Sequence, residues 1–190
     1  IPDEPNVEAR LTTLEIVVAG EGLPIPDDAA FYQAMPKAMW PHFNTMPFRR
    51  ACLPSGNGHV SARALARMYG VLANGGASDG VRLLSPEALA RATVLETDAL
   101  DLVLGQSLRK AAGFFLGGLR PDLQGNLVHG LLGPNERAFG HPGAGGSVGY
   151  ADPDLGLGVG ITVNKMQYPM PGEGDTREIS DLVRALAADV

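Results

Sequence analysis

Residues 139–166 read FGHPGAGGSVGYADPDLGLGVGITVNKM, and this glycine-rich stretch carries the most informative pattern in the chain. Two apolar runs, GSVGYAD and LGVGITVNK, flank the tetrapeptide Pro153-Asp154-Leu155-Gly156. Proline and glycine in a short polar segment between apolar runs favour a tight turn. The stretch therefore predicts a β-hairpin, and hence a sheet with antiparallel strands.

The same stretch contains a serine motif, because residues 145–149 read GGSVG and match G-x-S-x-G. A nucleophile elbow of this type needs a helix directly after the serine, and that helix helps to stabilise the oxyanion. Here Tyr150 leads into the proline turn, and all four histidines precede Ser147. Ser147 is therefore predicted to be a small strand residue. The alternative, an α/β-hydrolase nucleophile, requires a helix directly after Ser147.

A second serine motif lies at residues 107–110, where Ser107-Leu108-Arg109-Lys110 matches S-x-x-K. At the start of a buried helix this spacing lets the lysine help to deprotonate the serine. The residues that follow include AGFFLGG (112–118), which is typical of a short strand bounded by glycines. Ser107 is accordingly predicted to lie in a polar turn before a strand.

Three helices are predicted around the strands. Ser61 is a candidate N-cap for a helix over 62–74, whose apolar stripe comprises Leu65, Met68, Tyr69 and Leu72. Ser85 followed by proline predicts a second helix start. A third is expected over 175–190, with Ile179, Leu182, Val183 and Leu186 on its buried face.

These elements predict an α+β fold, with an antiparallel sheet flanked by helices. We expect residues 1–110 to form a helical and loop portion, and residues 111–190 to form the strands and the C-terminal helix. Prolines divide the segment 27–60 into short pieces, and its aromatic residues indicate that it packs against the body or forms a pocket wall.

The composition excludes several classes of protein. The chain has 190 residues, of which 45% are hydrophobic, and a net charge of −6. These values indicate a globular protein and disfavour a nucleic-acid partner, which requires a basic surface. No apolar run is long enough for a membrane span. A single cysteine and four scattered histidines predict neither a disulfide nor a metal site, and no cofactor is expected. The sequence does not determine the cellular compartment, although it slightly favours the cytoplasm.

Residues 139–166 also resemble the third conserved box of the serine β-lactamase-like family. This family includes class C β-lactamases, DD-peptidases and family VIII-type esterases. The box reads K-T-G in lactamases and H-x-G in many esterase relatives, and His141-Pro142-Gly143 matches the second form. The upstream segments SGNGHVSARALARMYGVLANGG and GVRLLSPEALA are also similar to the helical portion of the family, so that the resemblance covers residues 55–166.

The resemblance implies three site residues and an acyl-serine mechanism. Gly143 would let a substrate approach the strand edge, and the Ala144 amide would form half of an oxyanion hole. His141 would project into the cleft where lactamases hold a lysine. The implied substrate is a small ester or amide. Esterase activity is favoured over lactamase activity, because His141 replaces the lysine that would favour a substrate carboxylate.

Two boxes of the family are missing from this chain. No S-x-x-K opens an apolar helix, and none of the four tyrosines is followed two positions later by Asn or Ser. The opening IPDEPNVEARLTTLE is similar to the segment that follows the tyrosine box. The resemblance thus implies the C-terminal half of a hydrolase, without its N-terminal strands and nucleophile helix, and inactive in isolation.

Such a half would expose an open sheet edge and an apolar face. We expect these surfaces to be covered by the N-terminal half of the fold, as a preceding segment or a separate chain, or by self-association. The alternative function is a non-catalytic binding or scaffolding domain of the same fold. An S-x-x-K box and a Y-x-N/S box upstream would discriminate in favour of the enzyme.

Overall fold

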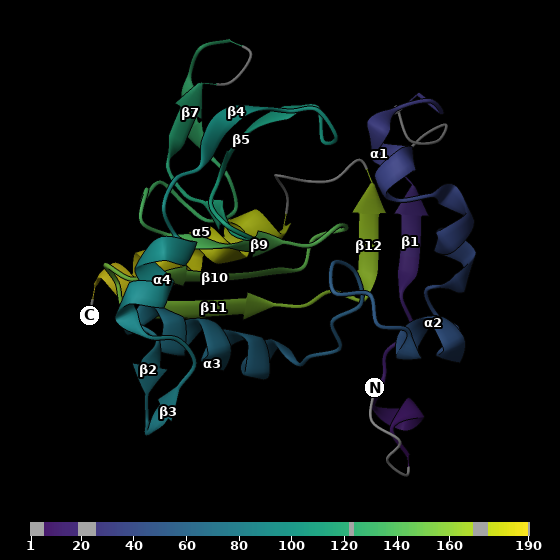
Figure 1. Cartoon of the computed structure of the whole chain (residues 1–190), viewed down its shortest axis with the longest axis horizontal. Helices are drawn as coiled ribbons and strands as arrows, with labels where there is room; N and C mark the ends of the chain where they lie inside the picture. Colours follow the sequence, from purple (N-terminus) through teal and green to yellow (C-terminus); the bar gives the residue numbers. More distant parts are fainter. Residues whose placement is uncertain (1–5, 19–25, 122–123, 169–174, 190) are drawn as a thin grey trace.

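The computed structural model describes residues 6–18, 26–121, 124–168 and 175–189 (Figure 1). Its centre is a six-stranded antiparallel sheet with the strand order β11-β10-β9-β6-β5-β4, so the predicted α+β class is confirmed. The six strands are β4 (Thr97–Asp101), β5 (Gln106–Lys110), β6 (Phe115–Leu116), β9 (Phe139–Pro142), β10 (Val148–Asp152) and β11 (Leu157–Ile161).

The predicted hairpin is confirmed as β10 and β11, which pair with Val148 opposite Ile161 and Asp152 opposite Leu157. The Asp152 carboxylate is buried, and its Oδ1 accepts the backbone N–H of Asp154 (3.2 Å) and the Asn135 side-chain amide (2.7 Å). These bonds satisfy the polar atoms of the turn and hold the ends of the two strands together.

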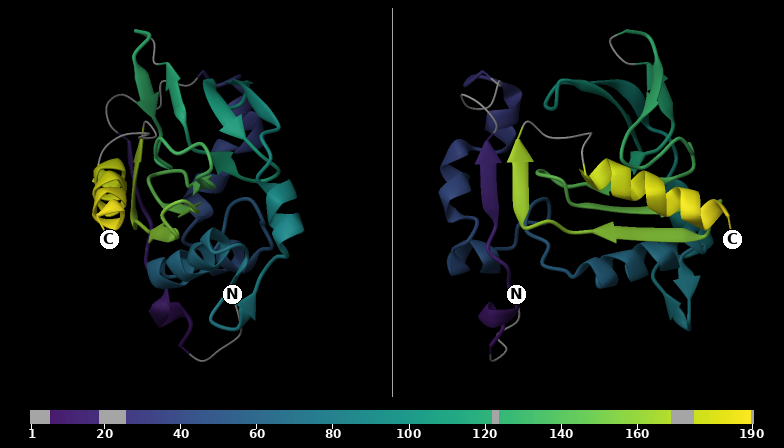
Figure 2. Two further views of the ribbon diagram at one scale, coloured as in Figure 1. Left: turned by 90° about the vertical axis from the view of Figure 1, so that its left-hand side faces the viewer. Right: turned by 180° about the vertical axis from the view of Figure 1, so that it is seen from behind.

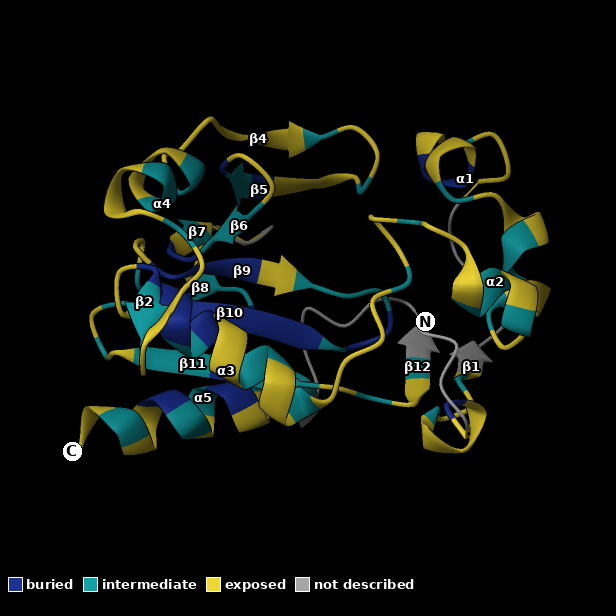
Figure 3. Cartoon of the chain, turned by 60° about the horizontal axis from the view of Figure 1, so that its bottom comes forward, coloured by how far each residue is buried: buried dark blue, intermediate teal, exposed yellow. Residues whose placement is uncertain are grey.

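The sheet is covered on its two faces by different helices. Side chains alternate across a strand, so Val148 and Tyr150 of β10 face one way while Gly149 and Ala151 face the other. Ala151 belongs to the core cluster that contains Tyr69 of α3 (Ala62–Ala73). Val148 and Tyr150 belong to a second cluster that includes Val183 of α5 (Asp175–Ala188). Figure 2 shows α5 against the face of the sheet away from α3, and Figure 3 shows β10 in the dark blue of buried residues.

Helix α3 begins and packs largely as predicted. The Ser61 hydroxyl accepts the Ala64 N–H at 3.2 Å, and Tyr69 and Leu72 are buried. The prediction for Met68 was wrong, since this residue is 40% exposed. The inward face is completed by small residues, because the helix lies too close to the sheet for a larger side chain.

That close approach depends on glycines in the sheet. A Cβ at Gly158 would lie 2.1 Å from the Gly70 nitrogen, and one at Gly160 would lie 2.5 Å from the Ala62 carbonyl oxygen. A Cβ at Gly149 would lie 2.3 Å from the Tyr69 ring. Distances this short exclude any side chain, so these glycines let α3 touch β10 and β11.

Helix α5 corrects the predicted buried face. Ile179, Leu182 and Leu186 are 47%, 60% and 61% exposed, and of the four predicted apolar residues only Val183 packs against the core. The side chains that face the sheet are instead polar, namely the buried Ser180 and Arg184.

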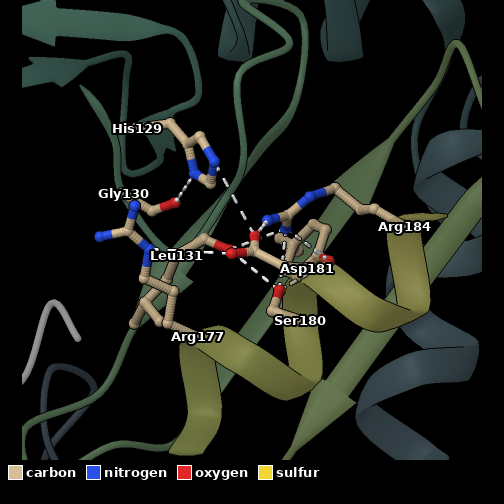
Figure 4. A network of polar contacts seen from close by, with 8 residues as sticks. His129, Gly130, Leu131, Arg177, Ser180, Asp181 and Arg184 are labelled. Carbon is tan, nitrogen blue, oxygen red and sulfur yellow. Dashed lines mark hydrogen bonds and ion pairs between the residues drawn. The ribbon is translucent and has the colours of Figure 1, made fainter. Parts of the chain in front are cut away.

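A polar network replaces apolar packing beneath α5 (Figure 4). The Arg184 Nη1 lies 3.0 Å from the Leu131 carbonyl oxygen and 2.9 Å from the Tyr150 hydroxyl, while Nη2 pairs with Asp181. The Ser180 hydroxyl lies 2.8 Å from the Tyr150 hydroxyl. A buried guanidinium with these partners is satisfied, so α5 is attached by a hydrogen-bonded clamp.

Smaller elements surround this body. β1 (Glu15–Val18) pairs in parallel with β12 (Lys165–Tyr168), and Figure 1 shows this pair beside α1 and α2. Two short hairpins are formed by β2 with β3 and by β7 with β8. The remaining bounds are η1 (Glu8–Arg10), α1 (Ala30–Ala34), η2 (Lys37–His42), α2 (Met46–Arg50), β2 (Ala77–Ser78), β3 (Val81–Arg82), α4 (Pro86–Ala92), β7 (Leu119–Pro121) and β8 (Leu127–His129).

The aromatic residues of the segment 27–60 pack among themselves. The ring centroids of Tyr32 and Trp40 are 6.3 Å apart, and those of Phe43 and Phe48 are 5.0 Å apart. Phe48 also borders an open, largely apolar pocket of about 460 Å³ within residues 38–48. The pocket is lined by Ala38, Met39, His42, Thr45, Pro47 and Phe48.

The proposed division at residues 110 and 111 stays a prediction. The structure places β5 and β6, which lie on either side of it, as neighbouring strands of one sheet. Strands β1 and β12 also pair across it.

Candidate active site

The three predicted site residues lie at the end of β9 and in the loop that follows it. His141 is exposed on β9, opposite Gly149 of β10, while Gly143 and Ala144 begin the connection to β10 and are half-buried. The His141 Nδ1 lies 2.7 Å from the Pro142 carbonyl oxygen. A carbonyl oxygen only accepts, so Nδ1 carries a proton in this arrangement. This leaves Nε2 as the nitrogen available to other groups.

The loop 143–147 is a tight, glycine-dependent turn. The Gly143 N–H donates to the Ser147 carbonyl oxygen at 2.6 Å, and the Gly146 N–H donates to the Gly143 carbonyl oxygen at 3.3 Å. Gly145 has φ +89°, and a Cβ there would lie 2.5 Å from the Met166 Cβ, so both conformation and space require glycine. The loop is thereby fixed against β12.

The Ala144 amide differs from its neighbour in this loop. While the Gly143 N–H closes the turn, no acceptor among the described residues receives the Ala144 N–H. A backbone donor held in a rigid turn and left unpaired can stabilise a negatively charged oxygen without reorganisation. Ala144 therefore has the free donor that the sequence-based prediction requires.

Ser147 has a structural role. It is followed directly by β10, so the helix required of a nucleophile elbow is absent from this fully described stretch. Its hydroxyl oxygen accepts the Val163 N–H at 3.1 Å, which ties the loop to the segment after β11. The prediction that Ser147 is a strand residue was wrong by one position, because β10 begins at Val148, and the α/β-hydrolase alternative is also wrong.

Ser107 and Lys110 do not form a catalytic pair. Both lie on β5, and residues three apart on a strand point to opposite faces of the sheet. The prediction of a polar turn before a strand was wrong, because residues 106–110 are themselves the strand, and within 112–118 only Phe115 and Leu116 are paired. The alternation of apolar and polar residues in this polar strand is too weak to reveal it.

A second group of side chains lies beside His141, and no local pattern in the sequence indicates it. The centroids of the His141 and Phe115 rings are 4.7 Å apart, with 36° between their planes. The Lys110 ammonium lies 5.0 Å from the Phe115 centroid and is paired with Asp101. The hydrogen bond from Lys110, with backbone N–H groups of the turn, holds the pKa of Asp101 below its usual value.

A model of the Beta-lactamase family matches residues 4–184, which is nearly the whole chain. The chain belongs to this family. The family resemblance predicted from residues 139–166 is therefore confirmed.

Three relatives put the beta-lactamase assignment in context. The Esterase/beta-lactamase LipL of Mycobacterium tuberculosis (strain ATCC 25618 / H37Rv) is 37% identical over 125 residues, which are 65% of this chain and 26% of LipL. A penicillin-binding protein homologue from Caulobacter crescentus is 37% identical, with a TM-score of 0.62 over 75% of this chain and 35% of that one. A family VIII carboxylesterase is also 37% identical, with a TM-score of 0.63 over 77% of this chain and 36% of that one. The chain thus spans about a quarter to a third of these relatives.

The described residues contain neither a metal site nor a membrane-spanning helix. Within the ranges given above, no group of three or more His, Cys, Asp and Glu side chains is arranged to hold a metal ion. No helix there is both long and apolar enough to cross a membrane.

Proposed function

We propose that this chain is the C-terminal part of a serine hydrolase of the beta-lactamase family, an esterase that acts through an acyl-serine intermediate. The observation that carries the proposal is the unpaired Ala144 amide beside the exposed His141 at the end of β9. The 37% identity to an esterase/beta-lactamase and to a carboxylesterase supports hydrolysis of a carboxylic ester.

In the proposed reaction, a serine outside these 190 residues attacks the ester carbonyl carbon. The carbonyl π electrons move to oxygen, and the Ala144 N–H stabilises the resulting oxyanion. Collapse of the tetrahedral intermediate expels the alkoxide, which takes up a proton, and leaves an acyl-serine that water then hydrolyses. His141 exchanges protons or hydrogen bonds through Nε2.

The substrate class follows from the character of His141. His141 replaces the lysine of the lactamase box, and that lysine is a cation that favours a substrate carboxylate. Small neutral acyl esters are therefore the proposed substrates, with lactams and peptides as less favoured amide substrates.

The N-terminal half of the fold is proposed to cover two surfaces that are exposed in this chain. One is the edge of β11, whose partner among the described strands is β10 alone. The other is the α5 stripe, formed by Ile179, Leu182 and Leu186. Burial of these three side chains would make the free energy of association more favourable by several kcal/mol, at about 25 cal/mol per Å² of apolar surface.

Hydrogen exchange can test this cover. Backbone amides of β11 should exchange slowly in the complete polypeptide and rapidly in the 190-residue chain, where the strand edge is open. A monomeric 190-residue chain with a fully protected β11 edge would contradict the proposed cover.

The function is tested by hydrolysis of a p-nitrophenyl ester. The complete polypeptide should show a burst of p-nitrophenol and an acyl adduct on one serine by mass spectrometry, while the 190-residue chain should be inactive. The matched variants Ser107→Ala and Ser147→Ala should retain the acyl adduct. Hydrolysis by the 190-residue chain, abolished by either variant, would show that the nucleophile lies in this chain and would overturn the proposal.

A further inference from the structure

The His141 imidazole is held from two directions. Its Nδ1 faces the Pro142 carbonyl oxygen at 2.7 Å, and its ring lies against Phe115 with 4.7 Å between centroids. His141 is nevertheless exposed, so neither packing from above nor a carboxylate among the described residues fixes the ring. An exposed histidine would otherwise sample several rotamers and both neutral tautomers.

Phe115 is itself fixed by its neighbours across the sheet. It lies opposite Lys110 of β5 on one side and opposite Gly140 of β9 on the other. The Lys110 ammonium is 5.0 Å from the Phe115 centroid, which is within the range of a cation–π contact. Asp101 accepts a hydrogen bond from Lys110 and also accepts the N–H groups of Val103 (2.9 Å) and Leu104 (2.8 Å).

We propose that Phe115 is a positioning residue for His141, and that the paired Lys110 and Asp101 hold the Phe115 ring in place. The ring selects the orientation in which Nδ1–H donates to the Pro142 carbonyl and neutral Nε2 is an acceptor. The proposal rests on the proposed esterase function for its catalytic consequence, but its structural part stands independently.

This arrangement determines whether Nε2 of His141 accepts or donates a proton. With the proton on Nδ1, neutral His141 can accept a proton or hydrogen bond at Nε2 but cannot donate one there. Loss of the Phe115 ring would free the imidazole to rotate, and productive orientations would become a fraction of the population. The expected result is a lower kcat with little change in KM, because substrate binding does not depend on the tautomer.

The experiment uses the complete polypeptide labelled with ¹⁵N-histidine. His141 is assigned by the loss of its signals in His141→Gln. The ¹⁵N shifts of its two ring nitrogens report the tautomer, and the wild type should show Nδ1 protonated and Nε2 unprotonated above the titration range. Phe115→Leu should give an averaged tautomer and a kcat reduced about 10-fold, a fraction of the usual effect of a general acid or base.

Two further variants make the test specific. Phe115→Tyr keeps the ring and should restore the wild-type tautomer and kcat. Phe114→Leu removes the neighbouring ring, which contacts Phe139 at 5.2 Å instead of His141, and should change neither readout. A protonated Nε2 in the wild type, or a Phe115→Leu variant with unchanged tautomer or unchanged kcat, would overturn the positioning role. If the tautomer responds as expected in a polypeptide that hydrolyses no ester, the proposed function fails while the structural part of the inference stands.

Discussion

The two helices that sandwich the sheet are attached in opposite ways. The backbone of helix α3 lies directly on β11 at Gly158 and Gly160, and its Tyr69 side chain lies on β10 at Gly149. Helix α5 is held by a buried polar clamp centred on Arg184 and leaves the α5 stripe in water. The difference teaches that the glycines of residues 139–166 serve helix packing, and that α5 is attached mainly through polar groups.

This comparison also explains the misleading serine motif. A side chain at position 149 would clash with the Tyr69 ring, and a side chain at position 145 would clash with Met166. Both glycines of G-x-S-x-G therefore have packing reasons that are unrelated to nucleophilic attack. The motif arises where a glycine-dependent turn meets a glycine-dependent helix contact.

The largest expected effect on stability comes from the α3 contact. Gly158→Ala would force a Cβ to 2.1 Å from the Gly70 nitrogen, and we expect it to lower the free energy of unfolding by about 3 kcal/mol. Gly70→Ala is the matched control, because a Cβ there has open space and alanine favours a helix. Urea unfolding should show a gain of about 0.5–1 kcal/mol for this control. Equal effects of the two changes would contradict the close-packing account.

A comparable but smaller loss is expected from the α5 clamp. Arg184→Met would leave the single proton of the Ser180 hydroxyl to serve both the Leu131 carbonyl and the Tyr150 hydroxyl, so we expect a loss of about 2–3 kcal/mol. Arg67→Met, at an exposed position of α3, should stay within about 0.5 kcal/mol of wild type. Thermal unfolding would measure both variants, and an unchanged Arg184→Met would show that apolar contacts alone attach α5.

The smallest expected effect concerns the support of His141 and depends on pH. The pKa of Asp101 is lowered in the folded state, so its stabilising contribution is complete above the unfolded pKa near 4 and is lost as pH falls through the folded value. Asp101→Asn should therefore cost about 0.5–1 kcal/mol at pH 7. The difference in the free energy of unfolding between Asp101→Asn and the wild type should vanish at low pH. A difference that is constant from pH 7 to pH 2 would exclude the Lys110 pair as its cause.

The sequence predicted the parts of the fold that depend on local signals. The Ser61 and Ser85 caps and the turn after Asp152 are set by neighbouring residues, and all three are present in the structure. The β4–β5 hairpin was missed because its two polar strands lack a clear alternation of apolar and polar residues. The buried face of α5 was misassigned, since Arg184 faces inward only because Tyr150 and Leu131 offer acceptors from distant parts of the chain.

The candidate site divides in the same way. His141, Gly143 and Ala144 are consecutive, so one family-like box predicted them together, and their catalytic roles stay predictions. Phe115, Lys110 and Asp101 come from three strands whose pairing no local pattern reveals. Residues that support a site across a sheet are found only once the register of that sheet is known.

The most direct test of the proposed hydrolase is the removal of a single N–H group. Lactic acid in place of Ala144 exchanges the backbone N–H for oxygen and leaves the methyl side chain unchanged. In the complete polypeptide, we expect kcat for a p-nitrophenyl ester to fall about 100- to 1000-fold with little change in KM. The same exchange at Ala112, which is exposed in the β5–β6 turn, should have no effect. A kcat within about twofold of wild type after the exchange at Ala144 would contradict the role of this amide as an oxyanion donor.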